Sequence, residues 1–183
     1  MDKDSNRTIH KLDAARSQLQ TAIQLWFADG DPVSIHTLTC AAHQILHDIH
    51  VQYGGMPLLF DSVFVKGDRR AKWNHAVKAH MNFFKHANRD PDSNMPFDPS
   101  LTEPFILISL YILEDAGAQL TPEEMMFRLW GTAHNPEWFD AHFGQDRFAQ
   151  GIHIEALAKL RHVPKQRFQR MCQFLIRQTA LGK

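Results

Sequence analysis

The stretch Phe105-Ile-Leu-Ile-Ser-Leu-Tyr-Ile-Leu113 is the longest apolar run of this 183-residue chain. It is about half as long as the ~20 residues with which a helix crosses a bilayer, so we expect a core helix and no membrane partner. A chain of this length that is 44% hydrophobic can bury one core. We therefore expect a single helical domain over residues 1–183, built around this run.

Helix start signals recur on both sides of the run. Proline follows a capping residue at Asp31-Pro32, Thr121-Pro122 and Asn135-Pro136, which is typical of the first helical turn. Apolar residues with a period near 3.6 connect these signals. The expected helices cover residues 9–28, 32–52, 70–88, 103–117, 122–131, 147–161 and 164–181, with a short one near 136–143. Only residues 63–65 suggest a strand. The pattern predicts an all-α, up-and-down helical bundle with additional C-terminal helices.

Charge and motifs exclude several classes of protein. Twenty bases balance twenty acids, which argues against a surface that binds nucleic acid everywhere. The charge is uneven, because residues 101–140 carry seven acids and one base, whereas residues 159–183 carry seven bases and no acid. The basic C-terminal helix can bind RNA, DNA or an acidic partner, or it can be a solvated face paired within the chain.

The sequence holds no motif of the common enzyme classes. It contains no Walker loop and no GxGxxG, GxSxG or HExxH motif.

The N-terminal residues and the two cysteines indicate the compartment. Residues 1–7 are polar, and no apolar segment typical of a secretion signal follows them. We therefore expect a cytoplasmic protein in which Cys40 and Cys172 are free thiols.

The chain holds twelve histidines, and four of them recur with a cysteine along the second expected helix. The residues of this histidine stripe are His36, Cys40, His43, His47 and His50. Their spacing of four and three places them within an arc of about 80°, opposite the apolar residues of the same helix. The stripe is therefore expected to face away from the main apolar contact.

Three interpretations of the histidine stripe remain open. Imidazole is a good zinc ligand, so His36, His43, His47 and His50 are candidate ligands of a divalent transition metal. The stripe can instead line the interface of a homodimer, or it can be a solvated polar face. Metal or dimer affinity should weaken between about pH 7 and pH 5, as the imidazoles become charged.

The third expected helix carries a second polar face. His80 falls on its apolar side and is expected to be buried, whereas His75, Asn82 and His86 share the other side. An imidazole, an amide and the ammonium of Lys85 are suited to stabilising a phosphate or another oxyanion. Candidate catalytic residues are therefore His75, Asn82, Lys85 and His86, with an ordinary exposed face as the alternative. The carboxylates of the following turn at residues 89–92 can orient a histidine or cap the helix.

The order of long helices and the Asn-x-x-x-His element at Asn82 and His86 resemble the HEPN all-α superfamily over residues 9–118. Many members of that superfamily are RNases or nucleotide-handling toxin and defence proteins. Its motif is an arginine, often followed by an asparagine, with a histidine four to six positions after the arginine. Here Met81 stands where that arginine is expected, whereas Arg70 and His75 satisfy the spacing without a polar residue after Arg70.

The resemblance implies a helical homodimer with the motif near its interface and an RNA or nucleotide phosphate as ligand. The departure at Met81 leaves RNase activity open. The two alternative functions are a metal-binding helical protein that uses the histidine stripe and a non-enzymatic oligomeric interaction module.

Overall fold

The computed structural model describes residues 7–88, 90–135 and 159–181, and these residues form helices and loops without a strand. The all-α prediction is thus confirmed. The elements are α1 (Lys11–Phe27), α2 (Pro32–Gln52), α3 (Gly67–Phe83), the short 3₁₀ helix η1 (Pro99–Leu101), α4 (Thr102–Asp115), α5 (Pro122–His134) and α9 (Lys165–Leu181). The helix expected near 136–143 lies outside the described residues, as does most of the one expected at 147–161.

Two sequence predictions about local structure differ from the fold. Residues 63–65 form turns instead of a strand, because the amide of Val63 donates to the carbonyl of Pro57 and that of Val65 to Ser62. Helix α3 begins at Gly67 and ends at Phe83, earlier at both ends than the expected range 70–88. A turn follows, in which the amides of Lys85 and His86 both donate to the carbonyl of Asn82.

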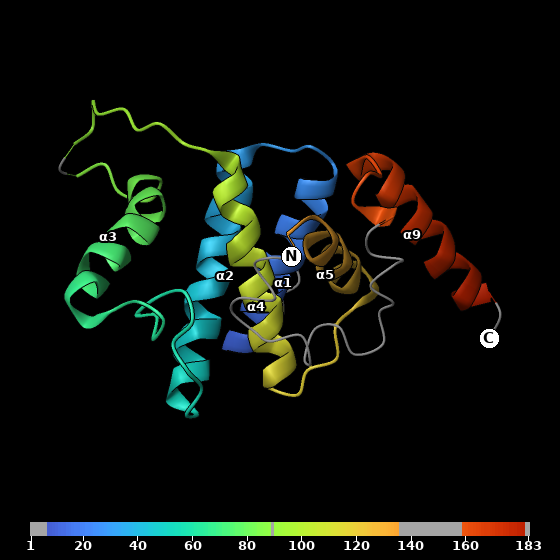
Figure 1. The fold of residues 1–183 in the computed structure, drawn as a ribbon, viewed down its shortest axis with the longest axis horizontal. Coiled ribbons are helices and arrows are strands. Elements are labelled where there is room, and N and C mark those ends of the chain that lie inside the picture. Colours follow the sequence, from blue (N-terminus) through green and yellow to red (C-terminus); the bar gives the residue numbers. More distant parts are fainter. Residues whose placement is uncertain (1–6, 89, 136–158, 182–183) are drawn as a thin grey trace, which may run out of the picture.

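Helix α4 is the centre of the bundle, as its apolar run predicts. Helices α1, α2 and α5 pack against it, and α2 packs against α1 as well (Figure 1). The core draws on all four of these helices and on the loop after α2, where Phe60 is fully buried. All residues of this run except Tyr111 are buried, which explains why α4 has no polar face.

Helix α5 begins with a capping box formed by Thr121 and Glu124. The Thr121 side chain accepts a hydrogen bond from the Glu124 amide, while the Glu124 carboxylate accepts one from the Thr121 amide. The same carboxylate, which is fully buried, accepts two hydrogen bonds from the guanidinium of Arg16 on α1. The Glu124 carboxylate therefore both caps the N-terminus of α5 and links α5 to α1.

The Thr121→Ala substitution is expected to lower the free energy of unfolding by about 1 kcal/mol, because it removes the acceptor of the Glu124 amide. Urea unfolding followed by circular dichroism measures this loss. Thr21→Ala is the matched control, since the exposed Thr21 hydroxyl only donates to a carbonyl within α1. A loss as large in the control would show that the cap contributes nothing specific.

Helices α3 and α9 lie at opposite sides of the bundle (Figure 1). Phe168 of α9 is buried, with its ring stacked on Phe27 at a centroid distance of 6.4 Å. Further along α9, Met171, Phe174 and Leu175 are exposed. None of the helices described is long and apolar enough to cross a membrane.

Candidate functional site

The histidine stripe of α2 is buried, so the prediction that it faces away from the core is wrong. His36, Cys40, His43 and His47 have exposed fractions of 1%, 0%, 0% and 7%. The prediction assumed that only the apolar side of α2 packs against the rest of the protein. In the structure, α2 packs against both α1 and α4. Its apolar side meets α1, and its histidine side meets α4 and the rings of Phe60 and Phe105.

Two histidines of α2 pair with two hydroxyl groups of α4. His36 Nδ1 lies 2.9 Å from Thr102 Oγ1, and His43 Nδ1 lies 3.0 Å from Ser109 Oγ. Both histidines and both hydroxyls are seven residues apart, so the contacts repeat after two turns. The Ser109 hydroxyl donates to the carbonyl of Phe105. It must therefore accept from His43, whose Nδ1 carries the proton and whose Nε2 is left without a hydrogen bond.

Burial keeps these side chains uncharged. Desolvation, with a smaller contribution from His80, lowers the pKa of His36 to about 4. It lowers the pKa of His43 to about 3 and also lowers that of His47. The same effect raises the pKa of the Cys40 thiol to about 12. The cluster therefore stays neutral and stabilises the contact between α2 and α4.

The predicted zinc site of His36, His43, His47 and His50 does not assemble. Nowhere in the described ranges do three or more histidine, cysteine or acidic side chains lie where they could share one ion. His50 instead faces Asp115, with its Nδ1 3.8 Å from the carboxylate. Nor can the buried stripe form an interface with a second copy.

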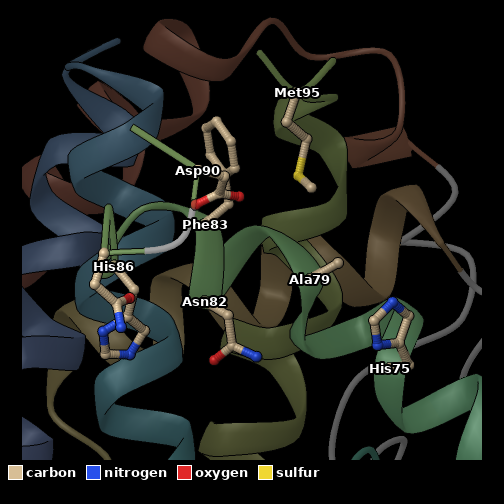
Figure 2. Close-up of a pocket in the computed structure, with 8 residues that line it drawn as sticks. His75, Ala79, Asn82, Phe83, His86, Asp90 and Met95 are labelled. Carbon is tan, nitrogen blue, oxygen red and sulfur yellow. The ribbon is translucent and has the colours of Figure 1, made fainter. Parts of the chain in front are cut away.

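The structure brings three of the four candidate catalytic residues together. His75, Asn82 and His86 all line one hollow of about 590 Å³ beside α3 (Figure 2). We call it the α3 hollow. Its other lining residues are Ala79, Phe83, Asn88, Asp90 and Met95. Lys85 is exposed on the same turn but does not line the hollow.

Part of the hollow was missed by reasoning from helical periodicity. Asn88, Asp90 and Met95 lie in the connection after α3, where no periodic pattern places a side chain. The only signal in the sequence is the turn-rich composition of residues 89–94. Asp90 was expected to orient a histidine or to cap the helix, but its carboxylate makes no hydrogen bond or ion pair with the rest of the described chain.

The two histidines of the hollow are too far apart to act on one phosphate. His75 and Asn82 are seven positions apart on α3, or about 10 Å along the helix. His86 lies beyond the end of α3, in the turn in which its amide donates to the carbonyl of Asn82. The side chains of His75, Asn82 and His86 are exposed and make no hydrogen bond to other described residues. The hollow thus offers a site around Asn82 and His86, with His75 at a distance.

Neither arginine position of the HEPN motif faces this site. Met81, where the arginine is expected, has an exposed fraction of 7% and packs into the core. Arg70 is half-buried, and its guanidinium donates to the carbonyl of Val65. Lys85 is therefore the cation nearest in sequence to Asn82 and His86.

The inner side of α3 fixes the hollow relative to the bundle. Trp73 Nε1 donates to the carbonyl of Leu59 at 2.7 Å, and Lys78 lies 4.3 Å above the Phe60 ring. His80, which was expected to be buried, is half-buried. Its Nε2 lies 3.0 Å from the carbonyl oxygen of Pro96. This hydrogen bond ties the connection after α3 back to the helix and so holds both walls of the hollow together.

Comparison with known proteins assigns no relative to this chain: no protein-family model, no curated protein and no solved structure matches it. The functional argument therefore depends on the geometry and chemistry of the α3 hollow.

Proposed function

We propose that this chain is a HEPN-like helical protein of a bacterial defence, toxin or regulatory type, and that its α3 hollow binds RNA or a nucleotide phosphate. One observation carries the proposal. Three polar side chains, His75, Asn82 and His86, line one hollow without hydrogen bonds to the described chain. Polar groups that line a hollow and are unpaired within the chain are available to bind a polar ligand.

Each side chain near His86 has a separate role in this proposal. The Lys85 ammonium balances the charge of a phosphate, and the Asn82 amide orients it by hydrogen bonding. The His86 imidazole, in its neutral form, can accept the proton of a ribose 2′-hydroxyl. His75 is about 10 Å from Asn82 along α3 and would contact another nucleotide of the same strand. A polynucleotide therefore uses the whole hollow better than a single phosphate does.

Binding and cleavage of RNA are tested with the His86→Ala variant. In fluorescence anisotropy with a labelled single-stranded RNA, we expect binding to weaken about tenfold, because the hydrogen bond between the ribose 2′-hydroxyl and His86 is lost. Any RNA cleavage should fall about 10²–10⁴-fold. The helical signal in circular dichroism should stay intact, since His86 is exposed.

His10→Ala is the matched control, because His10 is exposed before α1, outside the hollow. It should bind and cleave as the wild type does. Equal binding and equal cleavage by His86→Ala would remove His86 from the proposal.

A second candidate function, an oligomeric interaction module without enzymatic activity, is favoured by helix α9. Phe174 and Leu175 each have an exposed fraction of 61%, and Met171 one of 44%. Exposed apolar side chains that are adjacent on one helix are typical of contact surfaces. Sedimentation velocity of the wild type and of Phe174→Gln/Leu175→Gln tests this function. A wild-type dimer that the double substitution converts to a monomer would support it, and a monomeric wild type would contradict it.

A further inference from the structure

The carboxylate of Asp90 is not explained by a hollow that binds only phosphate. A carboxylate repels a phosphate, so it weakens binding wherever the two lie close together. Yet Asp90 lines the α3 hollow together with Asn82, Asn88 and His86. Its carboxylate has no partner in the part of the chain that the structure describes. The Asp90 carboxylate is exposed and is therefore free to accept hydrogen bonds from a donor group of a ligand in the hollow.

An aromatic ring lines the same hollow. Figure 2 shows Phe83 on α3, and Asp90 and Met95 on the connection that follows, all bordering the hollow. Phe83 is half-buried, so one part of it is fixed by the protein and another part is accessible. Aromatic side chains in single-stranded RNA sites stack on bases, while neighbouring polar groups bind the Watson–Crick edge. A base with donors on that edge fits both Phe83 and Asp90.

We propose that this part of the α3 hollow binds a guanine base of single-stranded RNA, an inference that rests on the proposed function. Two oxygens of one carboxylate can accept two parallel hydrogen bonds. Among the four RNA bases, only guanine has two adjacent donors on its Watson–Crick edge, N1–H and the N2 amino group. The carboxylate of Asp90 accepts both, and Phe83 stacks on the ring.

The remaining groups of the hollow suit the same ligand. The Asn88 amide has both donor and acceptor atoms, so it can pair with guanine O6 or N7. A volume of about 590 Å³ lies within the usual range for ligand pockets, about 300–1,000 Å³. A base and its phosphate can then occupy the hollow together, with the phosphate near Asn82 and His86. Pairing with the base edge requires an unpaired base, which excludes double-stranded RNA.

Isothermal titration calorimetry with the 5′-monophosphates of guanosine, inosine, adenosine, cytidine and uridine tests the proposal. Guanosine monophosphate should bind about tenfold more tightly than the adenosine, cytidine and uridine forms, because a bidentate contact discriminates by that factor or more. Inosine monophosphate, which lacks the 2-amino group, should lie between them. Asp90→Asn should reduce guanosine monophosphate to the affinity of adenosine monophosphate.

Asp92→Asn is the matched control, because Asp92 is exposed two residues further on and does not line the hollow. It should keep the preference for guanosine monophosphate. Equal affinities for all five nucleotides in the wild type would overturn the guanine proposal and leave the phosphate proposal standing. A guanine preference that survives in Asp90→Asn would also overturn it. If none of the nucleotides, inorganic phosphate or single-stranded RNA binds, the proposed function fails as well.

Discussion

Lowering the pH from 7.5 to 5 is expected to reduce the free energy of unfolding by about 4 kcal/mol. The cause is the buried pair His36 and His43. Their pKa values in the folded protein are about 4 and about 3, whereas an unfolded histidine titrates near ~6.5. Between these values the unfolded chain binds more protons than the folded one, so stability falls as the pH falls below about 6.5.

Each histidine contributes about 2 kcal/mol of this loss at pH 5, because one pKa unit corresponds to about 1.36 kcal/mol. His47 adds to the loss, since burial lowers its pKa too. Glu103 opposes it, because burial raises the pKa of that carboxyl and favours its protonated form in the folded protein. The exposed carboxylates whose pKa values are lowered, Asp29, Asp31 and Asp98, titrate below this range.

Urea unfolding at pH 7.5, 6.5, 5.5 and 5 measures the effect. The His43→Asn variant should show about 2 kcal/mol less pH dependence than the wild type over this range, whatever its stability at pH 7.5. His75→Asn, which changes an exposed histidine, should keep the full dependence. A wild-type stability that stays flat between pH 7.5 and pH 5 would contradict burial of neutral histidines.

The second large effect is expected for Arg16→Met, which should lower the free energy of unfolding by about 3 kcal/mol. The substitution keeps most of the side-chain volume and removes the guanidinium. The Glu124 carboxylate, with an exposed side-chain fraction of 0%, then loses the cation that pairs with it. From the described residues it retains the hydrogen bonds of the Thr121 amide and of Gln20, the latter at 3.3 Å.

The control for Arg16→Met is Arg128→Met. Arg128 pairs with Glu114, and both partners of that pair are partly exposed. Its loss should therefore cost less than about 1 kcal/mol. The double variant Arg16→Met/Glu124→Leu should recover part of the stability lost in Arg16→Met, because no buried charge remains. If Arg16→Met and Arg128→Met lowered the free energy of unfolding equally, the claim that burial of Glu124 makes its ion pair the more important one would be wrong.

The helices could be predicted from the sequence where local signals decide the structure. The cap at Asp31 accepts a hydrogen bond from the Ser34 amide at 2.7 Å, and the capping box at Thr121 forms as its spacing indicates. The run from Phe105 to Leu113 is buried apart from Tyr111. Each of these features depends on residues within one or two turns of the chain.

The burial of the histidine stripe could not be predicted from α2 alone, because it depends on a second helix. Thr102 and Ser109 are polar residues seven positions apart on an apolar helix, and they match His36 and His43. That shared spacing was the available signal, but it requires knowing that α2 and α4 are neighbours. For the α3 hollow, the helical face was predicted, whereas Asn88 and Asp90 depend on the path of a loop.

Nuclear magnetic resonance of the histidine rings tests the central claim, that the α3 hollow is the ligand site, most directly. Single-stranded RNA containing guanine is added to protein with ¹³C-labelled histidines, whose ring signals are assigned with single-histidine variants. We predict that the signals of His75 and His86 shift in proportion to bound RNA, and that those of His36, His43 and His47 stay in place. RNA binding that leaves the His75 and His86 signals unmoved would contradict the claim.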